Sequence, residues 1–154
     1  MCNTPYVTTA TPTLDDFVCF ALYRASLATT RAYREVLAPW DLTYPQYLAL
    51  VVLATGSRRV GDLAGELGLD SGTLSPLVRR LEQRGLVQRE RDRDDERVVT
   101  VSLTVAGRET RDALSDAVGC LVPTLTGSGT PPRELLSSLT HLAADMDAIA
   151  HAAH

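Results

Sequence analysis

The stretch that decides the fold is residues 60–103, which read VGDLAGELGLDSGTLSPLVRRLEQRGLVQRERDRDDERVVTVSL. Its first half predicts a short helix, a tight turn and a longer helix. The longer helix has apolar residues at the spacing that gives a helix one buried stripe, namely Leu74, Leu77, Val78 and Leu81. Gly85 suits the end of this helix, because glycine adopts the left-handed conformation that closes helices without steric cost.

The second half of the stretch predicts an antiparallel hairpin. Residues 86–91 form one strand and residues 97–103 the other, in which Val, Thr and Ser alternate. The DRDDE segment between the strands is too polar to pack and should project into solvent as a wing. Helix, turn, helix and hairpin in this order indicate a winged helix-turn-helix.

The outer face of the longer helix carries small side chains near its start and cationic or amide side chains further on. Such a face is often only solvated, but a helix that bears it can also enter a major groove and donate to base edges and phosphates. The basic hairpin directly behind the helix favours this second interpretation. The candidate DNA-binding residues of the helix are Gly72, Ser75, Pro76, Arg79 and Gln83.

The wing adds its own candidates for DNA binding. Arg93 and Arg97 lie at or beside the tip, and an arginine on a projecting loop suits a narrow minor groove, where the negative potential is strongest. Asp95, two residues before Arg97, can hold its guanidinium in one orientation. We therefore expect Arg93 and Arg97 to contact DNA and Asp95 to support the wing.

Length and composition indicate a single domain over residues 1–154, since the chain is long enough for a proper core. The net charge is −4, yet residues 57–111 hold eleven Arg and ten acidic residues, whereas the remainder holds four Arg and nine acidic residues. The chain has no Lys, so any cationic contact to phosphate must come from Arg. We expect a local basic face on an acidic body, with salt-dependent binding.

Several classes of protein are disfavoured. No apolar run of eighteen residues and no signal-peptide pattern is present, so we expect a cytoplasmic protein without a membrane partner. The cysteines Cys2, Cys19 and Cys120 are odd in number and widely spaced, which argues against a disulfide framework. With no CxxC motif or His pair, no metal site and no cofactor are expected.

Caps and prolines place the remaining helices. Thr13 or Asp16 can cap a first helix and Thr43 a second, because their side-chain oxygens accept from free backbone N–H groups. Thr104 can cap a helix that follows the hairpin, and Pro132 suits the start of the last helix. The expected fold class is mainly α with a small antiparallel β wing.

The two ends of the chain carry wider apolar faces than one small domain can cover. We therefore expect residues 1–12 to be a loose arm, 14–37 and 105–152 to be dimerisation helices, and 43–103 to be the winged helix-turn-helix. A twofold homodimer would place its two recognition helices about one DNA turn apart, matching a near-palindromic site in double-stranded DNA.

This order of elements, with DDER at 94–97 and VSLT at 101–104 leading into TxxG, resembles the MarR family of winged-helix regulators over about residues 14–152. CFALYRAS at 19–26 and DLTYPQYL at 41–48 resemble more specifically its organic-hydroperoxide-sensing branch, the OhrR repressors. The resemblance implies a dimeric repressor that leaves its operator when a cysteine of the first helix is oxidised.

Matched residue by residue, the resemblance implies that Cys19 is the sensor and that Tyr33 and Tyr44 hydrogen-bond its sulfur. A thiolate is the species that attacks a peroxide, and phenol hydroxyls can stabilise it without a salt bridge. Tyr33 follows Cys19 by fourteen residues, about 21 Å along one helix, so it would have to reach Cys19 of the partner subunit. Tyr23, one turn after Cys19, is either a third site residue or part of the core.

Some members of this branch carry a second cysteine near the end of the fifth helix. The resemblance therefore implies that Cys120 resolves oxidised Cys19 through an intersubunit disulfide. The alternative is an inert Cys120, with a small cellular thiol capping the sulfenic acid. Cys2 is taken as incidental.

The expected function is thus a DNA-binding repressor with an organic hydroperoxide as inducer, and not an enzyme. The alternative within DNA binding is a MarR-type repressor released by a small lipophilic or phenolic ligand, with Cys19 inert. A thiol peroxidase is disfavoured, since no second catalytic group lies near Cys19 in the sequence. A pure dimerisation module leaves Arg79 and Arg97 unexplained.

Overall fold

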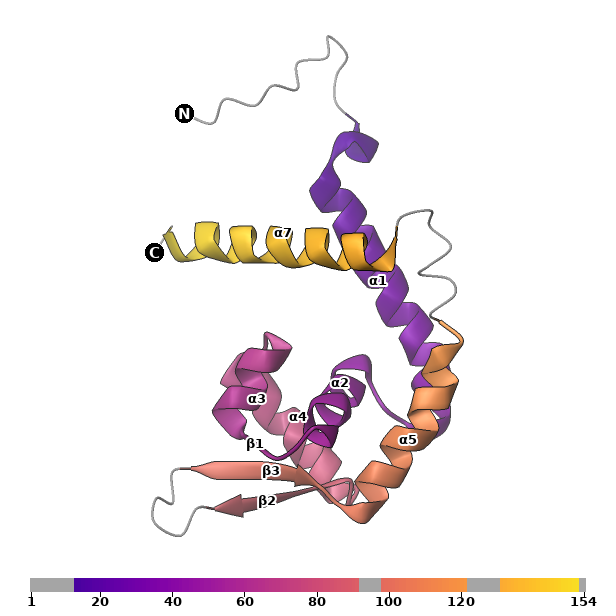
Figure 1. Cartoon of the computed structure of the whole chain (residues 1–154), viewed down its shortest axis with the longest axis vertical. Helices are drawn as coiled ribbons and strands as arrows, with labels where there is room; N and C mark the ends of the chain where they lie inside the picture. Colours follow the sequence, from indigo (N-terminus) through magenta and orange to yellow (C-terminus); the bar gives the residue numbers. More distant parts are fainter. Residues whose placement is uncertain (1–12, 92–97, 122–130, 153–154) are drawn as a thin grey trace. The chain divides into compact units, whose positions relative to one another are not determined.

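The computed structural model describes residues 13–91, 98–121 and 131–152 (Figure 1). The helices and strands, in chain order, are η1 Leu14–Asp16, α1 Val18–Leu37, η2 Ala38–Trp40, α2 Tyr44–Ala54, β1 Arg58–Arg59, α3 Val60–Leu67, α4 Ser71–Gln83, β2 Val87–Arg91, β3 Val99–Leu103, α5 Val105–Gly119 and α7 Pro132–Ala152. They form two compact units, Met1–Arg111 and Asp112–His154. The predicted fold class is confirmed, because the described residues are mostly helical with one small antiparallel sheet.

Helices α3 and α4 form the predicted helix-turn-helix. Gly68 ends α3 in the left-handed conformation, with φ 62°. Asp70 then caps α4, since its carboxylate accepts from the Thr73 N–H at 2.9 Å and the Thr73 hydroxyl at 2.7 Å. The predicted apolar stripe of α4 is buried throughout, and its members are Leu74, Leu77, Val78 and Leu81.

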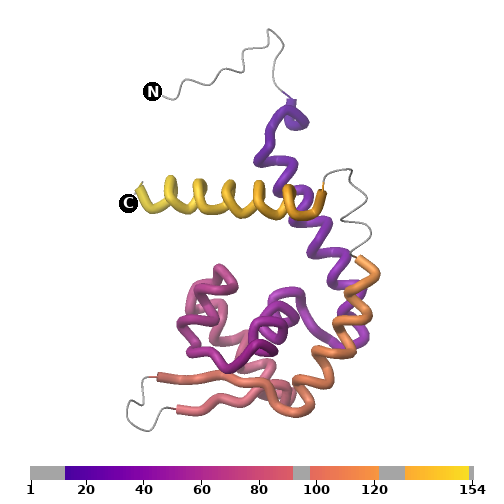
Figure 2. Tube along the Cα trace, in the orientation of Figure 1, coloured from indigo at the N-terminus to yellow at the C-terminus, as the bar shows by residue number. Residues whose placement is uncertain are grey.

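The wing is a three-stranded sheet in the order β1-β3-β2, with both pairs antiparallel. β2 and β3 run side by side in Figures 1 and 2, in a register that places Val87 opposite Leu103. Gly85 precedes β2 with φ 69°, as predicted. A third, short strand, β1, lies directly before α3 and pairs Arg58 with Val101.

Two further predicted caps are present. Thr43 caps α2, with its N–H donating to the Gln46 side-chain oxygen at 2.9 Å. The Thr104 hydroxyl accepts from the Gly107 N–H at 3.0 Å at the start of α5. Gly107 has no room for a side chain, because a Cβ there would lie 1.9 Å from the Leu86 carbonyl oxygen.

The predicted cap of the first long helix is wrong. Thr13 and Asp16 form a capping box, but they cap the single turn η1 rather than α1. The backbone is extended at Phe17, with φ −99° and ψ 112°, which separates η1 from α1. Phe17 becomes the N-cap residue of α1 without a side-chain hydrogen bond.

Helices α1 and α7, each taken by itself, leave their apolar faces open. The only buried residue of α1 is Leu37, and Val18 is 67% exposed. Helix α7 has no buried residue, and its Leu136 is also 67% exposed. Within residues 13–91, 98–121 and 131–152, no helix combines the length and apolar character needed to span a membrane.

Candidate functional site

The outer face of α4 is an exposed surface opposite the buried stripe. All five residues predicted for it from the sequence are exposed: Gly72, Ser75, Pro76, Arg79 and Gln83. Arg79 forms no hydrogen bond or close ion pair with any other residue that the structure describes, although its charge helps to lower the pKa of Glu82. Its guanidinium N–H groups are therefore available to an external acceptor. The predicted face is therefore present, with its cation toward the C-terminal half of the helix.

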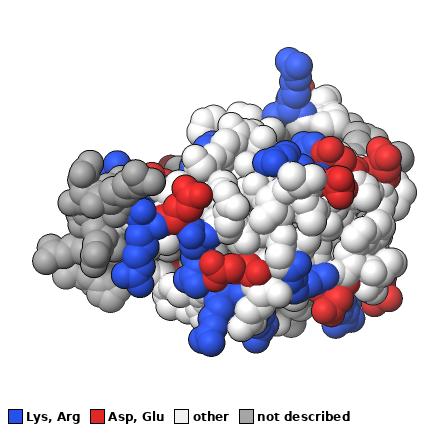
Figure 3. Space-filling model, turned by 90° about the horizontal axis from the view of Figure 1, so that it is seen from below, with Lys and Arg blue, Asp and Glu red and all other residues white. Residues whose placement is uncertain are grey.

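Two other arginines near α4 are already paired with carboxylates. Arg89 of β2 contacts Glu82 of α4 at 2.5 Å, and Arg58 of β1 contacts Glu66 of α3 at 2.6 Å. The hydrogen bond from Arg89 lowers the pKa of Glu82, so this carboxylate stays ionised beside its partner. These two ion pairs connect strands β1 and β2 to helices α3 and α4. Figure 3 shows basic and acidic side chains interspersed on one face of the molecule.

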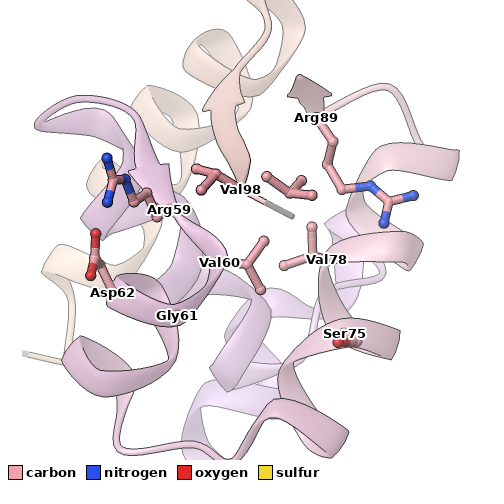
Figure 4. A pocket seen from close by; sticks show the side chains of 9 residues that line it. Arg59, Val60, Gly61, Asp62, Ser75, Val78, Arg89 and Val98 are labelled. Carbon is pink, nitrogen blue, oxygen red and sulfur yellow. The ribbon is translucent and has the colours of Figure 1, made fainter. Parts of the chain in front are cut away.

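A hollow of about 410 Å³ lies between the start of α3, α4 and the strands (Figure 4). Val60, Val78 and Val98 form its apolar part, while Arg59 and Arg89 lie on opposite sides of it. Neither Arg59 nor Arg89 was predicted as a site residue from the sequence. Their signal is weak in the sequence, because only the pairing of β1 and β2 with β3 brings them to one hollow.

The predicted wing residues Arg93, Asp95 and Arg97 lie outside the described residues. Their roles remain predictions from the sequence.

Cys19 is the second residue of α1, and it is exposed in the single chain. Tyr23 is 60% exposed, so within one chain it is not a core residue. α1 is unbroken from Val18 to Leu37. Its rise therefore separates Cys19 from Tyr33 by about 21 Å, and the two residues do not meet within one chain.

Tyr33 and Tyr44 do lie together. Their ring centroids are 4.2 Å apart with the planes tilted by 38°, which joins α1 to the start of α2. Tyr47 completes the group, with its centroid 5.9 Å from that of Tyr33. Tyr47 was not predicted to belong to this group, although its position three residues after Tyr44 places both side chains on one side of a helix.

The environment of these rings keeps the phenols protonated. Burial, followed by repulsion from Tyr44 and Tyr47, raises the pKa of Tyr33 above its ordinary value. Burial and then Tyr47 raise the pKa of Tyr44. Both hydroxyls are therefore hydrogen-bond donors across the whole neutral range, which is what an anionic sulfur requires.

Cys120 directly follows α5 and is exposed. Its S–H donates to the Ala117 carbonyl oxygen at 2.9 Å. Among residues 13–91, 98–121 and 131–152, no three His, Cys, Asp or Glu side chains gather closely enough to hold a metal ion.

Comparison with known proteins places this geometry in a family. Residues 31–114 match the family model described as transcriptional regulator SarA/Rot. The chain is 46% identical over 136 residues to the HTH-type transcriptional regulator TtmR of Methylorubrum extorquens, covering 87% of this chain and 68% of TtmR. It is 39% identical over 127 residues to the organic hydroperoxide resistance transcriptional regulator of Bacillus subtilis, covering 82% and 86% of the two chains.

A solved structure agrees in fold. The structure of reduced AbfR bound to DNA superposes with a TM-score of 0.76 at 28% identity, covering 86% of this chain and 94% of AbfR. The protein therefore belongs to the SarA/Rot group of MarR-like winged-helix transcriptional regulators.

Proposed function

We propose that this protein is a dimeric DNA-binding repressor that senses organic hydroperoxides through oxidation of Cys19 and then releases its operator. The observation that carries the proposal is the packing of the Tyr33 and Tyr44 rings, whose centroids are 4.2 Å apart, because it brings two protonated phenols close together. The similarity to a Bacillus subtilis regulator named for organic hydroperoxide resistance supports the same sensing function.

DNA binding is supported by the surface of α4 and the hollow beside it. Arg79 is exposed on the outer face of α4, where it can donate to a base edge or a phosphate. The hollow between α4 and the strands is bordered by Arg59, which can donate to a phosphate that lies between the recognition helix and the wing, whereas Arg89 is already paired with Glu82. AbfR, which is similar in fold and sequence, binds DNA in its reduced form.

Dimer formation is supported by the open face of α1. Val18 and Phe17 are 67% and 50% exposed, and exposed apolar surface of this kind is stabilised by a second copy. A twofold dimer through α1 can bring Cys19 of one subunit to Tyr33 and Tyr44 of the other, since one chain alone cannot. The sensor would then lie in the interface that sets the spacing of the two α4 helices.

The chemistry of sensing is a two-electron oxidation. The Cys19 thiolate attacks one peroxide oxygen, the O–O bond breaks, and the alkoxide leaves and takes a proton to become an alcohol. The sulfur becomes a sulfenic acid. This sulfenic acid then condenses with a thiol, either Cys120 of the other subunit or a small cellular thiol, and a disulfide and water form.

The proposal is tested with a duplex selected by the reduced wild-type protein from a random 30-bp pool. Cumene hydroperoxide should release the wild-type protein from this duplex, while Cys19→Ser should bind it equally well with and without peroxide. If Cys19→Ser is still released, the sensor lies elsewhere. Release of the wild-type protein by a lipophilic phenol but not by peroxide would support the alternative, a ligand-released repressor.

The resolving thiol is decided by non-reducing electrophoresis after peroxide treatment. A covalent dimer that is absent in both Cys19→Ser and Cys120→Ser supports Cys120 as the resolving residue. A monomeric, thiol-capped Cys19 in the wild-type protein contradicts that role.

A further inference from the structure

Arg84 links two segments that lie far apart in the sequence. It directly follows α4, and its guanidinium donates one hydrogen bond to the Asp41 carbonyl oxygen at 2.6 Å and another to the Trp40 carbonyl oxygen. Both acceptors are backbone groups in the turn between α1 and α2, more than forty residues away. One planar cation thus connects the end of the recognition helix to that turn.

The carbonyl groups of Trp40 and Asp41 need hydrogen-bond donors from outside their own helix. They lie at the C-terminal end of η2, which continues α1, where helix carbonyls lack partners within the helix. Asp41 ends η2 with φ 50° and ψ 45°, the only left-handed non-glycine residue in the part of the chain that the structure describes. A cation is stabilised at a helix C-terminus, and Arg84 lies at two of them, because it is also the C-cap of α4.

The same turn leads directly into Tyr44, one of the two proposed sensor tyrosines. Leu42, which follows Asp41, is 5% exposed, so this part of the turn is anchored in the core. Thr43 caps α2, and the next residue is Tyr44, whose ring packs on Tyr33. The Asp41 carbonyl is therefore three residues from one sensor tyrosine and one hydrogen bond from Arg84.

We propose that Arg84 is a positioning residue that couples the α1–α2 turn to the C-terminal end of α4. The proposal rests on the proposed redox function. When Cys19 oxidation displaces Tyr33 or Tyr44, the turn shifts, and the two-pronged guanidinium contact carries the shift to the recognition helix. A fork of two hydrogen bonds transmits orientation as well as position, which a single flexible ammonium does not.

A rival explanation is that Arg84, being exposed, only contacts a phosphate or only adds stability. Arg80 provides the matched control, because it lies one turn earlier on α4, is exposed and carries the same charge. Its side chain makes no hydrogen bond or ion pair to another residue among those the structure describes. Arg80→Gln therefore removes one charge near the same helix end without touching the turn.

The experiment measures Kd for the selected duplex before and after cumene hydroperoxide, by fluorescence anisotropy at one salt concentration. The quantity of interest is the ratio of oxidised to reduced Kd. We expect this ratio to fall by about fivefold or more in Arg84→Gln, the scale of a modest coupling between sites. It should stay at the wild-type value in Arg80→Gln, even if both of that variant's Kd values rise.

Arg84→Lys separates orientation from charge. It keeps the cation but cannot reproduce the planar fork, so we expect a reduced ratio with near-normal reduced Kd. A wild-type ratio in Arg84→Lys and Arg84→Gln overturns the coupling role, and if Arg84→Gln does not fold, Arg84→Lys alone decides. Peroxide release of Cys19→Ser, in contrast, contradicts the proposed function itself, so the two failures are distinguishable.

Discussion

Helices α4 and α1 are both amphipathic and belong to the same compact unit, but that unit buries the apolar stripe of α4 and leaves most of α1 exposed. The four apolar residues of the α4 stripe are all buried, and Leu74 is fully inaccessible. α1 is longer, yet only its last residue, Leu37, is buried, while Val18 remains 67% exposed. An apolar stripe covered within the chain stabilises the monomer's fold, whereas an open one stabilises an assembly.

The same contrast distinguishes the proposed DNA-binding face from the proposed peroxide sensor. The outer face of α4 is built by one chain and is complete as it stands. The proposed sensor is not, because α1 holds Cys19 and Tyr33 about 21 Å apart. The tyrosine pair is ready in each chain, but the sulfur that it would bind has to come from a second copy.

The largest expected effect comes from a charge on the open face of α1. Val18→Glu should cost the monomer little, since Val18 is 67% exposed, but it would bury an unpaired carboxylate in a dimer. We expect loss of the dimer in sedimentation equilibrium and a Kd for the selected duplex raised about 100-fold or more.

Thr30→Glu is the control for this change. Thr30 is an exposed α1 residue about 120° around the helix from Val18, so it adds the same charge outside the stripe. An intact Val18→Glu dimer, or equal loss in both variants, would show that this face is not the interface.

A pair of leucine truncations gives the next largest effect. Leu74→Ala should lower the free energy of unfolding by about 2–5 kcal/mol, because it leaves a cavity in a closed core. Leu27→Ala, at a 44% exposed position, should cost less. Urea unfolding at two protein concentrations measures both changes. Equal losses of unfolding free energy in the two variants would mean that Leu27 and Leu74 are buried to the same extent in solution.

Removal of the Arg79 charge from the outer face of α4 should weaken DNA binding. Arg79→Gln is expected to cost about 1–3 kcal/mol of binding free energy if Arg79 contacts a base, or to reduce the salt slope by about one if it contacts a phosphate. Arg31→Gln removes the same charge from exposed α1 and should leave both quantities near wild type. Anisotropy titrations across several salt concentrations distinguish the outcomes, and an unchanged Arg79→Gln would exclude this face.

The smallest expected effect is a loss of stability in acid. Hydrogen bonds from Arg89 lower the pKa of Glu82, and hydrogen bonds from Thr73 lower that of Asp70. In each case the pKa of the carboxyl is lower in the folded protein than in the unfolded chain. Such a carboxyl stabilises the fold at pH values above its unfolded-state pKa. This stabilisation is lost as the pH falls through its folded-state pKa. The free energy of unfolding should therefore decline slightly below about pH 4.5, the ordinary pKa of Glu.

Urea titrations between pH 3 and pH 6 measure this decline. Arg89→Gln should flatten the part that belongs to Glu82, and Asp70→Asn the part that belongs to Asp70. A profile that is unchanged in both variants would show that these α4 contacts do not contribute to the pH dependence.

Much of the winged helix could be predicted from the sequence. The stripe from Leu74 to Leu81, the cap at Thr43 and the helix end at Gly85 all depend on residues within one or two turns of each other. The predicted N-cap of α1 was wrong. The sequence does not reveal that the backbone is extended at Phe17, which leaves the capping box of Thr13 and Asp16 on the separate turn η1.

The local spacing of apolar, capping and glycine residues was thus enough to determine the helix-turn-helix, the strands and the exposed candidates on α4. Only the tertiary structure decided which distant side chains meet: Tyr47 beside Tyr33, Arg89 on Glu82, and Arg84 on the turn at Asp41. The physical reason is that helix and strand patterns arise from neighbours along the chain. Contacts between segments depend instead on how whole elements pack, which no short stretch of sequence encodes.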